Sequence, residues 1–208
     1  FADIGHTVYC VDKDENIINK LNYGKSPIYE PGLNELIKVN QRSKRLFFTS
    51  NIAEALNKSD IIFICVGTPS KKNSSSVDLS YVIQVAKEIS KFSKKKKLII
   101  TKSTVPVGTG DQIDKILNNK KKFTVISNPE FLREGEAIRD FRYPDRIIIG
   151  SDDVKSFSTM KILYLPLINK GAEFFRTSRR GAELIKYASN AFLATKITFI
   201  NEIANLCE

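Results

Sequence analysis

The run Asp60-Ile-Ile-Phe-Ile-Cys-Val-Gly67 is apolar at almost every position between a polar first residue and a glycine. Strands with one face in water alternate apolar and polar side chains, whereas strands of a parallel sheet are covered on both faces and are apolar throughout. The run therefore predicts a buried strand of a parallel sheet. The segment Gly67-Thr68-Pro69 predicts a turn at the carboxyl end of this strand.

On both sides of this run, short apolar segments alternate with segments whose apolar residues recur at helical spacing. Strands that alternate with helices are typical of a doubly wound α/β domain with a mostly parallel, Rossmann-like sheet. The other expected strands are residues 6–12, 46–50, 98–104, 123–127, 146–150 and 173–177. The expected helices are residues 16–23, 33–39, 52–58, 80–92, 111–117 and 153–165.

The sequence begins with Phe1-Ala-Asp-Ile-Gly5, which is typical of the last turn of a helix that ends at a glycine. In a dinucleotide-binding βαβ unit, a first strand, a Gly-x-Gly-x-x-Gly turn and a helix precede a second strand that ends in Asp or Glu. Asp12 has the position of that acidic residue, and the first strand and its Gly-rich turn are missing ahead of it. Acidic residues also end strands as ordinary turn chemistry, so this pattern alone leaves both interpretations of Asp12 open.

The segment Asn128-Pro-Glu-Phe-Leu-Arg-Glu-Gly-Glu-Ala-Ile-Arg-Asp140 follows the strand expected at 123–127. Asn128 and Pro129 end that strand, because the residue before a proline is held extended and proline donates no hydrogen bond. Charged residues then lie just beyond the strand, where ligands bind in open α/β sheets. A solvated turn that leads into a charged helix explains the same pattern equally well.

Three expected strand ends, at residues 67–69, 103–106 and 128–130, are predicted to meet at one edge of the sheet. Together they supply hydroxyl groups, backbone amides and carboxylates, the groups that a cofactor site requires. None of the three is specific alone, but their convergence favours a binding site over an ordinary set of turns.

From Ser178 to Glu208 the sequence shows no helix-breaking residue. A helix of about 30 residues would be about 45 Å long, which exceeds the usual length in a globular domain. We therefore expect a spine between two domains or a dimer interface. The corresponding domain prediction is a dinucleotide-binding domain at 1–177 and the start of a central helical domain at 178–208.

The composition is that of a globular protein, with 42% hydrophobic and 27% charged residues among 208. The sequence contains no apolar run of about 20 residues and no secretory signal, so we expect a cytoplasmic protein without a membrane partner. Cys10, Cys65 and Cys207 are expected to be buried free thiols. One histidine and no paired cysteines make a metal site improbable.

The formal charge of +10 comes largely from lysine clusters at 71–72, 94–97 and 120–122. Such clusters can hold nucleic acid by neutralising its phosphates. These clusters contain no interleaved aromatic residues and precede expected strands, at the end opposite the strand tips described above. We therefore favour solvated loops and expect no nucleic-acid partner.

Six ordered motifs make the whole chain resemble the UDP-glucose/GDP-mannose 6-dehydrogenase family, and the Pro-Asp-Arg sequence resembles its UDP-glucose branch. The motifs are Tyr29-Glu-Pro-Gly-Leu33, Val66-Gly-Thr-Pro69, Lys102-Ser-Thr-Val-Pro-Val-Gly108, Asn128-Pro-Glu-Phe-Leu-Arg-Glu-Gly135, Pro144-Asp-Arg-Ile-Ile-Ile-Gly150 and Lys186-Tyr-Ala-Ser-Asn-Ala-Phe192.

The resemblance implies oxidation of the C6 alcohol of a nucleotide sugar to a carboxylate with two NAD. In the family, an aldehyde forms first, a cysteine captures it as a thiohemiacetal, and the thioester that follows is hydrolysed. UDP-glucose is the implied substrate and a homodimer the implied assembly. A UDP-N-acetylhexosamine or GDP-mannose substrate, and an inactive remnant of the enzyme, stay open as alternatives.

The resemblance also implies roles for individual residues. The implied cofactor-binding residues are Asp12, Thr68, Thr104 and Glu134. The implied substrate-binding residues are Glu130, Phe131, Leu132, Arg133, Glu134, Lys186 and Asn190. The implied catalytic residues are Thr104 and Glu130, which place the catalytic water, with Glu130 as the acid and base, and Lys186 and Asn190 at the C6 oxygen. Lys186 and Asn190 are four residues apart and therefore share one helix face.

The sequence departs from the family in three places. The Gly-rich turn is missing, and Ile17 stands where the family often has a basic residue. The sequence also ends before the segment that carries the nucleophilic cysteine, so we expect little or no turnover from these 208 residues alone. Cys207 is not that cysteine, because it lies within the long helix at the position of a packing residue.

Overall fold

The computed structural model describes residues 1–71, 76–117 and 123–208, whose strands form a five-stranded and a two-stranded sheet. A five-stranded sheet has the strands in chain order, β3-β4-β5-β6-β7. β3 pairs with β4, β4 with β5 and β6 with β7 in parallel, and β5 meets β6 antiparallel at Ser127 and Gly150 alone. The bounds are Ile61–Ile64 for β3, Lys97–Thr101 for β4, Phe123–Ser127 for β5, Arg146–Gly150 for β6 and Glu173–Thr177 for β7.

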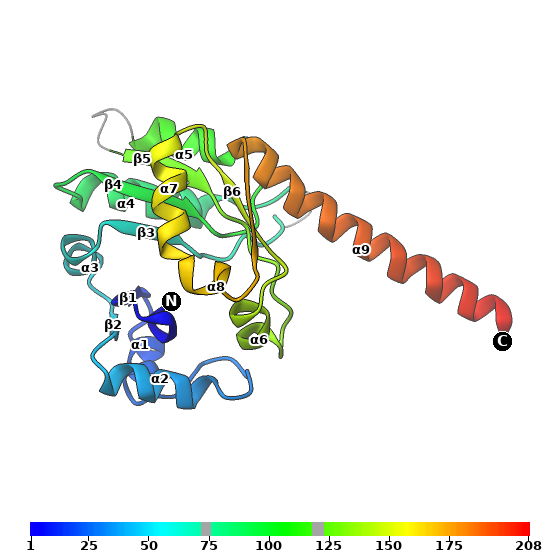
Figure 1. Cartoon of the computed structure of the whole chain (residues 1–208), viewed down its shortest axis with the longest axis horizontal. Helices are drawn as coiled ribbons and strands as arrows, with labels where there is room; N and C mark the ends of the chain where they lie inside the picture. The colour runs from blue at the N-terminus through cyan, green and yellow to red at the C-terminus, as the bar shows by residue number, and fades with distance from the viewer. Residues whose placement is uncertain (72–75, 118–122) are drawn as a thin grey trace.

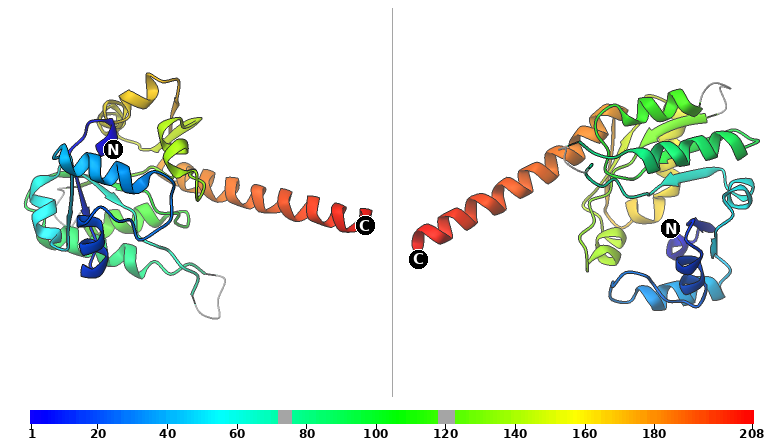
Figure 2. Two further views of the ribbon diagram at one scale, coloured as in Figure 1. Left: turned by 90° about the horizontal axis from the view of Figure 1, so that it is seen from below. Right: turned by 180° about the vertical axis from the view of Figure 1, so that it is seen from behind.

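Helices cover both faces of this sheet (Figures 1 and 2). α4 (Ser80–Phe92) and α5 (Thr109–Leu117) lie on one face, and α7 (Val154–Leu163) and α8 (Leu165–Ile168) on the other. Adjacent residues of a central strand enter opposite cores: Ile99 packs with the residues of α4 and α5, and Ile100 with those of α7 and α8. This double coverage is why these strands are apolar throughout, and the predicted doubly wound, mostly parallel fold is confirmed.

The amino-terminal part contains a separate two-stranded parallel sheet, β1 (Val8–Val11) with β2 (Leu46–Thr49). The 3-10 helix η1 (Ala2–Ile4) ends at Gly5, whose φ of 105° suits glycine, as the sequence predicted. Phe1 anchors this part to the larger sheet, because its ring lies 4.9 Å from that of Phe63 and 5.3 Å from that of Tyr164. The remaining helices are α1 (Glu15–Asn22), α2 (Leu33–Arg42) and α3 (Ile52–Lys58).

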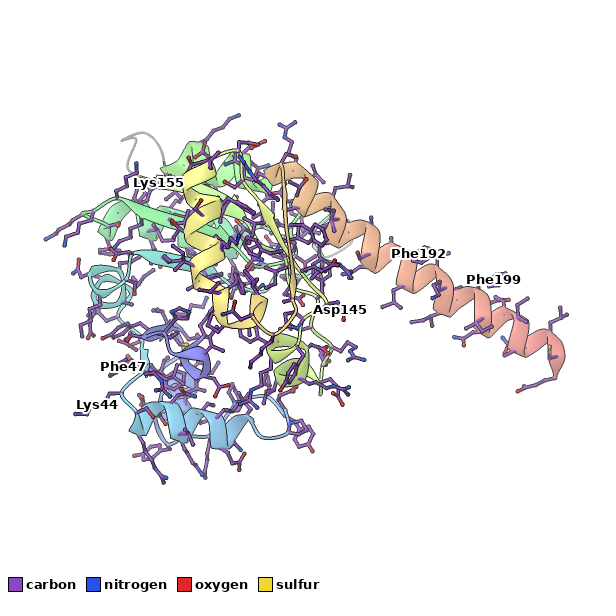
Figure 3. All side chains as sticks on the ribbon, viewed as in Figure 1. Lys44, Phe47, Asp145, Lys155, Phe192 and Phe199 are labelled. Carbon is purple, nitrogen blue, oxygen red and sulfur yellow. The ribbon has the colours of Figure 1, made fainter. Side chains whose placement is uncertain are left out.

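The last helix, α9 (Arg179–Cys207), contains 29 residues and projects away from the sheet (Figure 1). Its first turn packs tightly on β6 at Gly150, where an added Cβ would lie 2.6 Å from Ala182 Cβ and 2.9 Å from Arg179 Cα. From Asn190 onward every residue is exposed, as the side chains in Figure 3 illustrate for Phe192 and Phe199. The predicted long helix is confirmed, and its anchored end lies at the carboxyl end of β7.

Two expectations about individual elements need correction. The helix expected at 153–165 is two helices, because Pro166 lies in the first turn of α8 and donates no backbone hydrogen bond to continue α7. Lys97 does not belong to a solvated cluster: it is buried in β4 and donates a hydrogen bond to the carbonyl oxygen of Ser59. The cluster at 120–122 and Lys72 lie outside the described residues.

The thiols were expected to be buried, and this is wrong for two of the three. Cys65 and Cys207 are exposed, and Cys10 is half-buried. Cys65 lies beyond Ile64, the last residue of β3, and Cys207 lies at the exposed end of α9, so neither is covered by the core. In the described part of the chain, no helix combines the length and the apolar character needed to cross a membrane.

Candidate functional site

The loops that follow β3 and β4 are joined at the carboxyl edge of the sheet. Thr68 Oγ1 donates a hydrogen bond of 2.8 Å to the carbonyl oxygen of Thr104. Ser103 Oγ donates one of 2.7 Å to the carbonyl oxygen of Val66. Because parallel strands end at the same edge, these two loops meet as predicted, and Thr68 and Thr104 lie together.

Glu130, just beyond β5, meets Lys186 of α9. Glu130 Oε1 lies 3.0 Å from Lys186 Nζ, and Glu130 Oε2 accepts a hydrogen bond of 2.6 Å from the Leu132 backbone N–H. Lys186 is only 7% exposed, so its ammonium has little access to water and is paired with this carboxylate instead. Two segments that are more than 50 residues apart in sequence therefore bring an ammonium and a carboxylate into one place.

The Phe131 ring lies close to two cations. Arg146 Cζ is 4.6 Å from the centre of the Phe131 ring, and Lys186 Nζ is 5.3 Å from it. Cations over an aromatic face are attracted by its negative quadrupole, so Phe131 helps to hold Lys186. Arg146 was not among the predicted site residues, although it begins the strand of the Pro-Asp-Arg motif.

The next residues of the segment face a short helix, α6 (Ala137–Arg142). The Arg133 guanidinium donates to Asp140 from Nε at 3.0 Å and from Nη2 at 2.6 Å. The Asp140 carboxylate thus orients the Arg133 side chain, whose predicted contact with substrate stays a prediction. Leu132 and Glu134 are exposed at the same edge.

Glu30, from the loop before α2, holds the other end of this segment. Its Oε2 accepts a hydrogen bond of 3.0 Å from the Gly135 N–H, and its Oε1 accepts one of 3.2 Å from the Ile138 N–H. Glu30 thus satisfies two amides at the start of α6, as a helix cap does. The Tyr29-Glu-Pro-Gly-Leu33 motif therefore has a structural role at the site that sequence reasoning did not assign.

Lys102 and Asn128 form a polar centre behind Glu130. Lys102 Nζ lies 3.4 Å from Asn128 Oδ1 and 3.5 Å from the Pro129 carbonyl oxygen. Tyr164 donates a hydrogen bond of 2.6 Å to the same Asn128 oxygen. Burial lowers the pKa of Lys102 to about 8, so a substantial fraction of this amine is neutral near that pH.

Two cavities border these groups. The larger has a volume of about 510 Å³, within the usual range for small-molecule sites; its lining includes Lys102, Glu130, Phe131, Arg133, Asp140 and Arg146. The smaller, of about 10 Å³, is bordered by Thr101, Thr104, Ser127, Glu183 and Lys186, among others. Within the described chain, Thr101 Oγ1 is the one buried side-chain polar atom without a hydrogen-bond partner.

Two further predicted site residues, Asp12 and Asn190, make no hydrogen bond or ion pair with the groups described above. Asp12 follows β1 and is half-buried, and its Oδ1 accepts a hydrogen bond of 2.9 Å from the Asp14 N–H. Asn190 lies one turn beyond Lys186 and is exposed. Asp12, Thr68 and Thr104 each follow a parallel strand, the arrangement that suits the ribose and phosphate groups of a dinucleotide. The residues present therefore fit a part of such a site.

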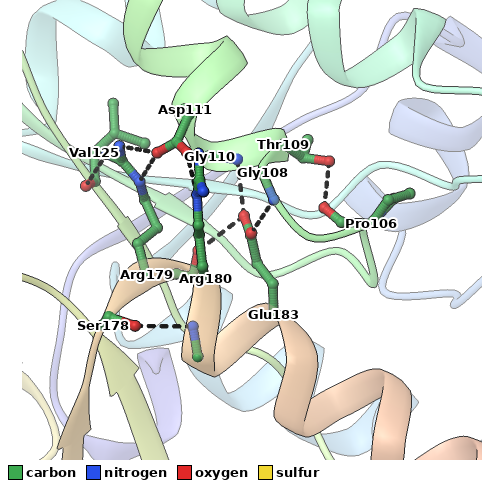
Figure 4. A network of polar contacts seen from close by, with 12 residues as sticks. Pro106, Gly108, Thr109, Gly110, Asp111, Val125, Ser178, Arg179, Arg180 and Glu183 are labelled. Atoms are coloured by element: carbon green, nitrogen blue, oxygen red, sulfur yellow. Dashed lines mark hydrogen bonds and ion pairs between the residues drawn. The ribbon is translucent and has the colours of Figure 1, made fainter.

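Sequence reasoning missed Glu183, which α9 places 3% exposed beside the first turn of α5 (Figure 4). Its Oε2 accepts a hydrogen bond of 2.7 Å from the Gly108 N–H, and its Oε1 accepts one of 2.8 Å from the Gly110 N–H. Burial raises the pKa of Glu183, and the two amides act in the opposite direction. The sequence did contain one indication of this role: Glu183 lies three residues before Lys186 and therefore on the same helix face.

No cysteine of the described residues lines either cavity. Cys207 follows Lys186 by 21 residues on one helix, which corresponds to about 31 Å at 1.5 Å per residue. Cys10 is in β1, and burial raises its pKa to about 11, so it is a thiol at neutral pH. Among the described residues, no three His, Cys, Asp or Glu side chains are grouped as metal ligands.

The sequence matches two models of one family. Residues 1–168 match the NAD binding domain of the UDP-glucose/GDP-mannose dehydrogenase family, and residues 180–208 match its central domain. A UDP-glucose 6-dehydrogenase of Rhizobium meliloti is 53% identical over 213 residues, which cover 100% of this chain and 49% of that protein. A UDP-glucose 6-dehydrogenase of Pseudomonas aeruginosa is 43% identical over 214 residues, which cover 100% and 47%.

Solved structures agree with these matches. A UDP-glucose dehydrogenase from Pyrobaculum islandicum has a TM-score of 0.92 and 40% identity, over 97% of this chain and 48% of that chain. A GDP-mannose dehydrogenase from Pseudomonas aeruginosa has a TM-score of 0.88 and 37% identity, over 97% and 48%. The chain thus spans about half the length of the relatives it matches.

Proposed function

Because the chain belongs to the UDP-glucose/GDP-mannose dehydrogenase family, we propose that it contributes to the NAD-dependent oxidation of UDP-glucose to UDP-glucuronate. The match to the NAD binding domain of the family agrees with the predicted cofactor, NAD. The names of the curated relatives favour UDP-glucose as substrate. A GDP-mannose dehydrogenase among the similar structures keeps GDP-mannose as the main rival.

The observation that carries this proposal is the 3.0 Å contact between Lys186 and Glu130. An ammonium beside a carboxylate, both at the carboxyl edge of a parallel sheet, suits a reaction in which an alcohol loses a proton and a hydride. NAD supplies the hydride acceptor, so that one alcohol, one water and two NAD⁺ give one carboxylate, two NADH and three protons. Glu130 accepts the alcohol proton and later directs water, and Thr104 lies on the opposite loop to help place that water.

Lys186 and Asn190 stabilise the negative charge that develops on the C6 oxygen. Preorganised donors of this kind act strongly where water is excluded, and Lys186 is 7% exposed. Its contacts with Glu130 and Phe131 hold the ammonium in place before substrate arrives. Asn190 is exposed on the same helix face, so its amide is free to turn toward a bound sugar.

We assign the remaining residues to binding. Asp12 holds the adenosine ribose, and Thr68, Thr104 and Glu134 line the rest of the cofactor site. Residues 130–134 border the nucleotide sugar, and the Arg133 guanidinium, which Asp140 orients, keeps further N–H groups for that contact. The domain boundary at 177/178 and a homodimer built on α9 belong to the same proposal.

The cofactor assignment is tested by calorimetric titration of the 208-residue chain with NAD⁺. Asp12→Ala is expected to weaken binding about tenfold or more, as the loss of hydrogen bonds to a charged group does. Asp152→Asn, an exposed acidic residue outside the site, is the control and should bind as the wild type does. Equal affinity in wild type and Asp12→Ala contradicts the role of Asp12.

The activity is tested at 340 nm as NADH formed by the protein expressed from the complete gene. UDP-glucose is expected to be preferred over GDP-mannose and UDP-N-acetylglucosamine. Glu130→Gln should lower kcat by about 10² to 10⁴, the usual contribution of a general base. NAD⁺ binding without turnover of any of the three sugars supports the inactive-remnant alternative and rejects the proposal.

A further inference from the structure

Glu183 has a buried carboxylate whose contacts are with the backbone of another element. It joins α9 to the amides of Gly108 and Gly110, at 2.7 and 2.8 Å (Figure 4). Ser127 Oγ, at the end of β5, lies 3.5 Å from Oε1. The role proposed above for the site does not use this carboxylate.

The amides of Gly108 and Gly110 lie at the amino end of α5, where backbone N–H groups have no partner within the helix. A carboxylate satisfies both amides and interacts favourably with the positive end of the helix dipole. The absence of a side chain at Gly110 permits this approach, because an added Cβ would lie 3.0 Å from Glu183 Oε1 and 2.5 Å from Arg179 Cδ. The contact therefore depends on both helices: α9 supplies the carboxylate, and α5 supplies the two amides and the glycine that leaves room for it.

This contact fixes the loop that carries Thr104. The loop leaves β4 at Thr101 and enters α5 at Thr109, and its beginning is held by the hydrogen bond from Ser103 to Val66. Glu183 holds its end. Thr104 therefore lies on a loop that is fastened on both sides.

The same contact fixes the turn of α9 that carries Lys186. Glu183 and Lys186 are three residues apart on one face of the helix, and both border the 10 Å³ cavity together with Thr104. A change in the distance between Glu183 and α5 would therefore move the Lys186 ammonium relative to Thr104 and Glu130.

We propose that Glu183 is a positioning residue, which sets the place of Lys186 relative to the Thr104 loop, and this inference rests on the proposed function. Simple attachment of α9 does not require it, since Asp111 on α5 already pairs with Arg179 and with Arg180 of α9. Glu183 instead ties the two segments of the site whose relative position matters for the reaction.

The proposal is tested by NMR on the 208-residue chain, without substrate. In Glu183→Ala, the exchange protection of the Gly108 and Gly110 amides is expected to fall about tenfold or more, as for a lost charged hydrogen bond. The side-chain ¹⁵N signal of the Lys186 ammonium, assigned with Lys186→Arg, should shift or broaden because its contact with Glu130 is no longer fixed. Glu183→Gln keeps the side-chain volume and one acceptor, so it provides a folded variant that should restore protection at one of the two glycines.

Two controls separate positioning from general stability. Asp111→Asn weakens the other contact between α5 and α9, so it should lower the melting temperature and leave the Lys186 signal in place. Glu202→Gln, on the exposed part of α9, should change neither. Unchanged glycine and Lys186 signals in Glu183→Ala, or equal loss of the Lys186 signal in Asp111→Asn, overturns the proposal.

Steady-state kinetics of the protein expressed from the complete gene then test whether the position of Lys186 affects the reaction. Glu183→Ala should lower kcat about tenfold or more and change the KM for NAD⁺ little, as expected when an interaction specific to the transition state is misplaced. A wild-type protein that shows the NMR contacts and no turnover refutes the proposed function and retains the positioning by Glu183. A wild-type enzyme whose kcat is unaffected by Glu183→Ala refutes the positioning role.

Discussion

Lys102 is held in surroundings that disfavour its charge. Burial is the largest influence, and Lys186 adds to it, whereas Cys65 and Glu130 partly oppose it. Its hydrogen bonds go to neutral oxygens, Asn128 Oδ1 at 3.4 Å and the Pro129 carbonyl at 3.5 Å. The result is a pKa of about 8 in the folded chain, against an ordinary value of 10.5.

This difference predicts a pH dependence of stability. Between pH 8 and 10.5 the unfolded chain binds more protons at Lys102 than the folded chain does, so the free energy of unfolding rises with pH in this window. Lys102→Met should remove that rise, which amounts to about 3 kcal/mol. Urea denaturation at pH 7.5, 9 and 10.5 measures it, with Lys155→Met, an exposed lysine of α7, as control. Parallel pH curves for wild type and Lys102→Met would contradict the prediction.

Individual site residues were predictable only where a motif named them. Glu130 and Lys186 lie in motifs, and the structure brings them to 3.0 Å. Glu183 and Glu30 were missed, because their partners are backbone amides 73 and 105 positions away, which leave no mark in the sequence. The pairing of Arg133 with Asp140 was also missed, because it depends on how α6 folds back, and the assignment of Arg133 to substrate stays a prediction.

At the level of elements, apolar spacing predicted most helices and strands, because local patterns determine which residues face the two cores. The strand 123–127 and the helices 52–58 and 80–92 have the predicted bounds. β3 and β4 end at Ile64 and Thr101, earlier than predicted. Beyond Thr101 the ladder stops, because the backbone N–H groups of Lys102 and Ser103 both donate to Ile64, the last residue of β3. The apolar pattern of the sequence continues past these ends into loops that border the site.

The loop before α2 acts on an element far from it in sequence. Glu30 accepts hydrogen bonds from Gly135 and Ile138 and thereby starts α6. The short helix has six residues and no side-chain cap of its own at Glu136, so this carboxylate replaces one. The segment from Glu130 to Glu134 is thus held at one end by β5 and at the other by Glu30.

Removing this cap should loosen α6 before it affects the sheet. Glu30→Gln is expected to lower the free energy of unfolding by about 1 kcal/mol, the usual value of a helix cap. Amide exchange at Gly135 and Ile138 should accelerate, while exchange in β4 and β5 stays slow. Glu35→Gln, an exposed residue of the adjoining helix, is the matched control. Slow exchange at both amides in Glu30→Gln would show that another group holds α6.

For the whole molecule, the unusual feature is that α9 leaves the domain with large apolar side chains in water. Phe192, Phe199 and Ile203 are 67%, 64% and 40% exposed, and Leu206 is 82% exposed. At 100° per residue, these four residues share one face of the helix. A contiguous exposed apolar face of this kind usually marks an interface, which is consistent with the dimer that we propose.

That dimer predicts a dependence of mass on concentration. The double change Phe192→Glu and Phe199→Glu should raise the dimer dissociation constant about 100-fold or more, since burial of each Phe side chain contributes roughly 1.5 to 3 kcal/mol. Asn201→Glu with Asn205→Glu adds the same charge to the opposite face of α9, so this variant should dimerise as the wild type does. Sedimentation equilibrium measures all three proteins. If both variants lose the dimer equally, added charge rather than the apolar face is responsible, and a wild-type chain that is monomeric at every concentration leaves this face without a role in self-association.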